Sequence, residues 1–165
     1  MKRACTGNLQ NQLQNVIWAK PGPEQDAAIV VDSAGFPYVG AGMNACTRDL
    51  ARFGQMMMQQ GEYNGEQIVP KDWIDDTCYA DDQARANLAV SDDGAMMPGG
   101  HYRNQVWVAN ADHGILVAIG IHGQVIHINM RPQVVIVKFS THPESADSLL
   151  FQVVFMAMRA LSNSV

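Results

Sequence analysis

The stretch Ala118-Ile-Gly-Ile-His-Gly-Gln-Val-Ile-His127 decides the fold of this 165-residue chain. It joins two apolar runs, residues 115–121 and 125–129, through the pair His122-Gly123. Short apolar runs on either side of a glycine-containing break are typical of two β-strands joined by a turn. The sequence therefore predicts an antiparallel strand pair with His122, Gly123 and Gln124 at the boundary between its strands.

Further strand-like runs lie on both sides of this pair. Residues 105–109 precede it and residues 134–139 follow it, with Asp112-His-Gly114 and Arg131-Pro132 at the joints. Consecutive strands separated by short joints favour an antiparallel meander, which we place at residues 102–140. We expect a sheet of about four strands.

Outside the sheet, apolar residues recur at helical spacing. One helix is expected to begin at Thr47, which can cap it, and to end before Gly61. Shorter helices are expected at residues 8–18 and 71–79. A broad apolar face after Pro143-Glu144 predicts a C-terminal helix over residues 144–161 that lies across the sheet.

These elements predict one partial α+β domain over residues 1–165. Residues 1–80 are expected to be mainly helical with a short strand pair. Residues 81–101 have no sustained apolar period and are expected to form a long surface loop. The fold class is α+β, an antiparallel sheet of about four strands with flanking helices and a C-terminal helix.

The composition points away from nucleic acid and toward a buried interface. The net charge is −5, and the 11 basic residues are scattered along the chain, so no surface that would follow a phosphate backbone is indicated. Charged residues make up 16% of the chain and hydrophobic residues 47%, which leaves less charge than usual to cover the outside.

No cofactor is indicated by the spacing of potential ligands. The three cysteines lack any Cys-x-x-Cys pair, and the histidines lack His-x-x-x-His spacing, so we expect no metal and no disulfide framework. Met1-Lys-Arg leads into polar residues, without the apolar core of a secretory signal. The run 115–121 is too short to span a bilayer. We therefore expect a cytoplasmic chain with no membrane segment.

Two segments, Asn44-Ala-Cys-Thr-Arg-Asp-Leu-Ala-Arg-Phe-Gly54 and Tyr63-Asn-Gly-Glu-Gln-Ile-Val-Pro-Lys-Asp-Trp73, resemble the β-lactamase-related serine hydrolases. This family holds the class C β-lactamases, similar esterases and the 6-aminohexanoate-dimer hydrolases. Its members use a Ser-x-x-Lys nucleophile and base, a loop tyrosine, and a third triplet on a sheet strand that lines the pocket. The resemblance implies that His122, Gly123 and Gln124 are this third element, although a hairpin turn with a solvated histidine would give the same triplet.

The first two elements of such a site are missing from the sequence. No serine has lysine three positions later, and no Gly-x-Ser-x-Gly occurs. Tyr102-Arg103-Asn104 spells the Tyr-x-Asn of some family members, yet it lies too close to His122 and leads into a strand. We therefore interpret Tyr102 as an aromatic residue at the start of a strand.

The resemblance implies a truncated or remnant serine hydrolase of the esterase, amidase or β-lactamase type that is inactive alone. Its ligand would be a small ester, amide or lactam. The alternative is a non-catalytic binding or assembly module that associates with itself, and a third hypothesis is that another chain supplies Ser-x-x-Lys. We expect a homodimer, because the meander should leave an unpaired edge and an uncovered apolar area.

Overall fold

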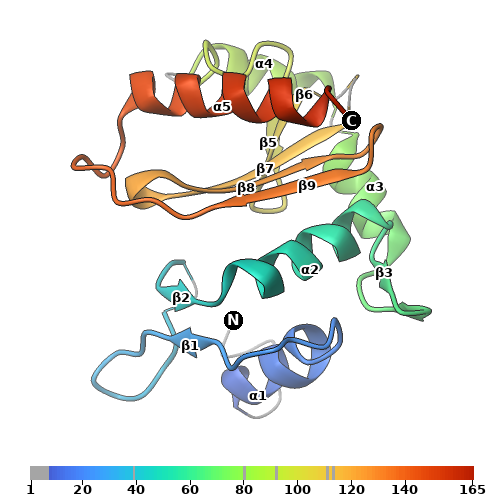
Figure 1. Cartoon of the computed structure of the whole chain (residues 1–165), viewed down its shortest axis with the longest axis vertical. Helices are drawn as coiled ribbons and strands as arrows, with labels where there is room; N and C mark the ends of the chain where they lie inside the picture. The colour runs from blue at the N-terminus through green and yellow to red at the C-terminus, as the bar shows by residue number, and fades with distance from the viewer. Residues whose placement is uncertain (1–7, 39, 80, 92, 111, 113) are drawn as a thin grey trace.

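The centre of the structure is a five-stranded antiparallel sheet with strand order β5-β6-β7-β8-β9 (Figure 1). The strands are β5 (His101–Arg103), β6 (Val106–Asn110), β7 (Ile115–Gly120), β8 (Gln124–Asn129) and β9 (Val134–Lys138). This computed structural model describes residues 8–38, 40–79, 81–91, 93–110, 112 and 114–165. The predicted α+β class, with its antiparallel sheet and C-terminal helix, is confirmed.

The sheet has one strand more than the expected four because the chain turns sharply at Asn104-Gln105. Both residues have a positive φ, 52° and 65°, which is the backbone of a two-residue hairpin turn. Arg103 consequently pairs with Val106, and the segment 101–103 becomes the separate edge strand β5.

Two helices cover opposite faces of the sheet (Figure 1). Helix α2 (Thr47–Met58) packs on one face, and helix α5 (Ser148–Ser162) packs on the other. Side chains of a strand alternate between faces, so Leu116 of β7 joins the core under α2 while Val117 joins the core under α5. The sheet is therefore the middle layer of three.

Helix α2 approaches the sheet closely at Gly54. A Cβ atom at this position would lie 2.6 Å from Cγ1 of Val135 on β9. A side chain here would push the helix away from the strand, so the missing Cβ sets the spacing between these layers.

The C-terminal helix begins later than expected. Its N-cap is Asp147, whose carboxylate accepts a hydrogen bond from the Leu150 amide at 2.9 Å, so α5 starts at Ser148 and not at residue 144. The N-cap of α2 also differs from the prediction, because Thr47 is the first helical residue and Cys46 takes the cap position.

The prediction of a loop over residues 81–101 is wrong in its first half. Helix α4 (Asp82–Ala89) forms there, and the Asp81 carboxylate caps it by accepting from the Ala84 amide at 2.9 Å. Leu88 is the only buried residue described in this helix, so no apolar stripe marks it in the sequence.

The first half of the chain lies mainly beyond α2 as seen from the sheet (Figure 1). The helix expected at residues 8–18 is present as α1 (Leu9–Leu13) and the wider π-helical turn η1 (Gln14–Trp18). Two short strand pairs are present where one was expected: β1 (Ala28–Ile29) with β2 (Met43–Asn44), and β3 (Glu62–Tyr63) with β4 (Glu66–Gln67). The short helix α3 (Lys71–Cys78) follows them. Within the described residues, no helix combines the length and apolar character needed to cross a membrane.

Asp49 joins this N-terminal part to α2. Its carboxylate is 2% exposed and accepts hydrogen bonds from the amides of Glu24 at 2.9 Å and Gln25 at 3.1 Å. Arg52, one turn along the helix, donates to the same carboxylate at 2.5 Å. Burial opposes ionisation of Asp49, but the Cys46 thiol, which also donates to the carboxylate, and these donors outweigh it and hold the pKa of the carboxyl below its ordinary value.

A buried histidine lies under α5. His127 of β8 is 3% exposed, and its Nε2 atom has no hydrogen-bond partner among the described residues. It pairs across the sheet with Val117 and Ile136, both of which belong to the core under α5. Burial lowers the pKa of His127 from 6.5 to about 4, because the charged ring would lose its hydration.

This histidine makes stability depend on pH. An unfolded histidine takes up its proton near pH 6.5 and the folded one only near pH 4, so stability falls as pH decreases through this window. The full loss is about 3 kcal/mol for such a difference in pKa. Urea unfolding between pH 4 and 7 should show it, and His127→Gln should flatten the profile. Equal slopes for wild type and variant would show that other groups cause the dependence.

Candidate functional site

The His122-Gly123-Gln124 triplet lies at the turn between β7 and β8. Residues Ile121–Gly123 form one short helical turn, η2, and Gln124 is the first residue of β8. His122 has φ of 58° and Gly123 has φ of 85°, so two successive residues adopt left-handed backbone. Glycine adopts this conformation without the steric cost that a side chain brings, which explains its place in the turn.

The turn is held from one side by the segment that follows β9. The His122 amide donates to the Ser145 carbonyl at 2.9 Å, and the His142 amide donates to the His122 carbonyl at 3.1 Å. Nδ1 of His122 lies 2.9 Å from the carbonyl of His142. Because a carbonyl can only accept, Nδ1 carries the proton in this contact.

The Gln124 side chain is committed to the same segment. Its Nε2 donates to the Ser140 carbonyl at 2.5 Å, and its Oε1 accepts from the Ser140 amide at 3.0 Å. This pair of bonds imitates a strand pairing and continues the β8–β9 ladder past Lys138, which is the partner of Val125. Gln124 therefore fixes the position of the turn.

Lys138 and His142 lie against Gly123. The Lys138 ammonium donates to the Gly123 carbonyl at 3.0 Å and lies 3.4 Å from Nε2 of His142. A Cβ on Gly123 would lie 2.4 Å from Cε1 of His142, so the imidazole can pack on this backbone only because residue 123 is glycine. The triplet, Lys138, Ser140 and His142 together form what we term the triplet cluster.

Sequence reasoning missed three members of this cluster: Lys138, Ser140 and His142. The available signal was the strand register, because pairing 125 with 138 places the residues after β9 beside the turn. That register becomes visible only once the geometry of the turn between β8 and β9 is known.

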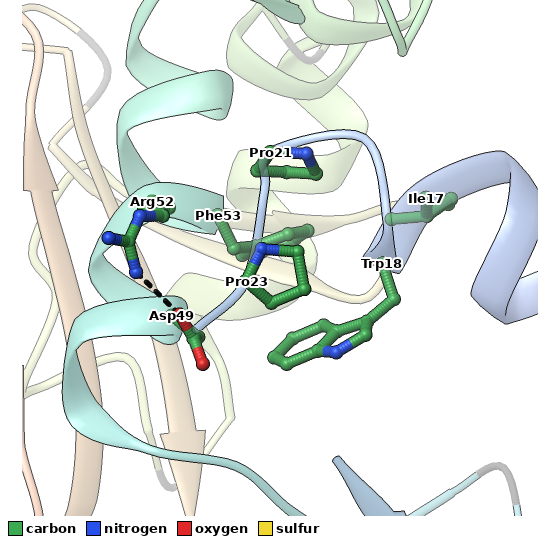
Figure 2. A pocket seen from close by; sticks show the side chains of 7 residues that line it. All are labelled: Ile17, Trp18, Pro21, Pro23, Asp49, Arg52 and Phe53. Carbon is green, nitrogen blue, oxygen red and sulfur yellow. Dashed lines mark hydrogen bonds and ion pairs between the residues drawn. The ribbon is translucent and has the colours of Figure 1, made fainter. Parts of the chain in front are cut away.

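Two hollows among the described residues are lined by residues other than the triplet. The smaller hollow, about 10 Å³, lies between Trp18, Pro23 and Phe53 beside the Asp49–Arg52 pair (Figure 2). It has room for about one water molecule and no more. The larger hollow, about 340 Å³, lies near the β6–β7 and β8–β9 turns, at the end of the sheet away from the triplet.

The segment before β5 enters the sheet away from the triplet. It enters the sheet at His101, which pairs with Val108, and Val108 pairs with Leu116. Leu116 lies four residues before the end of β7 at Gly120, so the segment joins the sheet well away from the turn. The role of the triplet as a pocket wall stays a prediction.

Tyr102 and His101 both have structural partners. The Tyr102 ring packs against Trp107 with centroids 4.5 Å apart, and its hydroxyl donates to Gln105, as expected of an aromatic in a strand. Nε2 of His101, which is fully buried, lies 2.9 Å from the Thr77 carbonyl. Burial lowers the pKa of His101 below its ordinary value. His113 lies outside the described residues.

Possible metal ligands are dispersed in the described part of the chain. No three histidine, cysteine, aspartate or glutamate side chains gather there in a way that could hold a metal ion. Cys46 and Cys78 are free thiols. Burial raises the pKa of Cys78 to about 11, which makes it a poor nucleophile.

Known proteins resemble this chain in sequence and in fold. No protein-family model matches the chain. The 6-aminohexanoate-dimer hydrolase of Paenarthrobacter ureafaciens is 34% identical to it over 134 residues, which is 80% of this chain. A solved structure of a candidate 6-aminohexanoate-dimer hydrolase from Bacillus anthracis superposes with a TM-score of 0.77, at 30% identity over 93% of this chain. The chain belongs to the β-lactamase-related hydrolase family.

The match covers only part of these relatives. The chain spans 33% of the Paenarthrobacter ureafaciens hydrolase and 38% of the Bacillus anthracis protein. The five-stranded sheet and its two covering helices are thus a portion of the fold of this hydrolase family.

The triplet cluster should respond sharply to a side chain at position 123. Gly123→Ala adds a left-handed alanine, at a cost of about 1 kcal/mol, and a clash with His142 of about 1–3 kcal/mol. Gly65→Ala is a matched control, because Gly65 also has a positive φ but has open space around it. Urea unfolding should give Gly123→Ala a lower free energy of unfolding than Gly65→Ala. In a His142→Ala background the two alanine substitutions should cost the same. Equal losses would mean that His142 does not pack on Gly123.

Proposed function

We propose that this chain forms the pocket wall of a β-lactamase-related serine hydrolase, with His122, Gly123 and Gln124 as its third active-site element, and has no acyl-transfer activity by itself. The observation that carries the proposal is the left-handed turn at the triplet, placed at a strand boundary of a sheet shared with hydrolases. The ligand class is a small ester, amide or lactam.

The geometry of the turn suits a wall better than a reacting group. Nδ1 of His122 is held by the His142 carbonyl, so Nε2 is the ring nitrogen left to contact a ligand. The Lys138 ammonium lies directly behind the Gly123 carbonyl and contributes positive charge at the triplet. Contacts from the segment after β9 hold the backbone in place, so the wall is formed before any ligand arrives.

Acyl transfer needs more than this wall. A serine hydroxyl becomes nucleophilic only when a neighbouring base takes its proton, and the sequence contains no Ser-x-x-Lys to supply both. Lys138 and Ser140 lie close in sequence, but the Ser140 backbone is bound to Gln124 and the Lys138 ammonium to Gly123 and His142. These contacts do not support Ser140 and Lys138 as a nucleophile and its base.

We expect no turnover of an activated ester, a chromogenic β-lactam or a linear amide beyond the background rate. A site without a nucleophile keeps at most a small residual acceleration from binding. His122→Ala should therefore leave the measured rates unchanged. Mass spectrometry after incubation with a fluorophosphonate should find unmodified protein. Stoichiometric labelling of one serine, together with turnover that the label abolishes, would overturn the proposal.

A second candidate, a self-associating assembly module, is favoured by the outer face of α5. Leu149, Val153 and Met156 are 68%, 50% and 64% exposed. Their spacing of four and then three residues is that of a helix–helix seam. Strand β9 is in addition an edge of the described sheet. We propose that a second copy of the chain covers this row.

Light scattering should then give twice the chain mass of 18.0 kDa. Val153→Glu should yield a monomer, because it places a charge in the middle of the apolar row. Gln152→Glu is the matched control, since it adds a charge at an exposed neighbour outside the row. A monomeric wild type, or a dimer that Val153→Glu leaves intact, would contradict the assembly proposal.

A further inference from the structure

The larger hollow lies at the end of the sheet opposite the triplet. Its walls come from the turn between β6 and β7 (Asp112 and Gly114), the turn after β8 (Met130 and Arg131), and helices α3 and α4. In a meander, successive turns lie at alternate ends of the sheet, so the β7–β8 turn is at the other end. Strand β7 separates the two by about 20 Å, at ~3.4 Å per residue.

Two arginines line this hollow. Arg85 comes from α4 and Arg131 from the turn between β8 and β9. Neither forms an ion pair with a carboxylate of the described residues, whereas Arg48, Arg52 and Arg103 each do. Two guanidinium groups that lack carboxylate partners thus face one cavity.

The Arg85 side chain, which lines the hollow, has one unsatisfied donor. Its Nε atom is buried and has no hydrogen-bond partner among the described residues. A buried N–H without an acceptor costs about 1–3 kcal/mol, and more when the group is charged. An acceptor atom supplied by a ligand would remove this cost. Arg131, by contrast, already donates to the Asp112 carbonyl.

The charge of the wall favours a single negative charge. Among the described residues of the lining, the two arginines contribute +2 and the Asp112 carboxylate −1, which leaves +1. Planar guanidinium groups match the geometry of carboxylate oxygens with paired hydrogen bonds. Met130 and Cys78 add an apolar side, and the volume of about 340 Å³ is that of a small-molecule site.

We propose that this hollow, hereafter the arginine pocket, binds a small monocarboxylate, with the carboxylate on Arg85 and Arg131 and a short hydrocarbon chain against Met130. Because the arginine pocket and the triplet lie at opposite ends of the sheet, the site is independent of the proposed pocket wall.

Calorimetry on the full chain with butyrate as the probe tests this site. Butyrate should bind, and its uncharged isostere butyramide should not. Arg85→Gln and Arg131→Gln should each weaken butyrate binding by about tenfold or more, since each removes charge-assisted hydrogen bonds. Arg48→Gln, which changes an exposed arginine outside the pocket, should have no effect. The NMR resonance of the Arg85 Nε–H group should shift on addition of butyrate.

Several outcomes would overturn the proposal. They are no butyrate binding to the folded wild type, equal binding of butyramide, or affinities unchanged by both pocket variants. Binding of inorganic phosphate as tightly as butyrate would show that the arginine pocket takes anions in general, and would refute its assignment to a monocarboxylate. If Arg85→Gln does not fold, Arg131→Gln carries the test, because Arg131 is exposed and its loss removes little packing. None of these results depends on acyl-transfer activity.

Discussion

The structure depends on one constraint: the central strands β7 and β8 are buried on both faces, and each face must be covered by a helix. Leu116 and Ile128 point toward α2, while Val117 and Val125 point toward α5. A sheet exposed on one side carries polar residues at every second position, whereas β7 is apolar along its whole length and β8 buries even its polar His127. The chain therefore needs a helix before the sheet and another after it, and the C-terminal helix completes the second core.

The same constraint positions the triplet. Each strand of the covered pair is fixed in register by side chains on both faces, so the turn between them has little freedom. Gly123 lets His142 pack on the backbone, and Gln124 ties Ser140 to the start of β8. The register of the two strands and these contacts thus set the position of the turn.

Local sequence patterns predicted what depends on apolar periodicity and missed what depends on long-range contacts. Alternation and composition were enough for the strands around His122 and for the α5 helix. Strand β5 was missed because Asn104-Gln105 contains no glycine, and α4 because it buries little beyond Leu88. Lys138, Ser140 and His142 reach the triplet, and Arg85 and Arg131 line one hollow, only through the folded chain. Long-range contacts of this kind leave no local pattern.

Hydrogen exchange resolved by residue tests the central claim that the doubly covered strand pair positions the triplet turn. The amides of residues 116–119 and 125–128 should be the slowest in the chain and should exchange only with global unfolding, because both faces of these strands are buried. Residues 82–89 and 9–18 should exchange faster, since they bury few side chains. Exchange of β7 and β8 as fast as that of α4 would contradict the account.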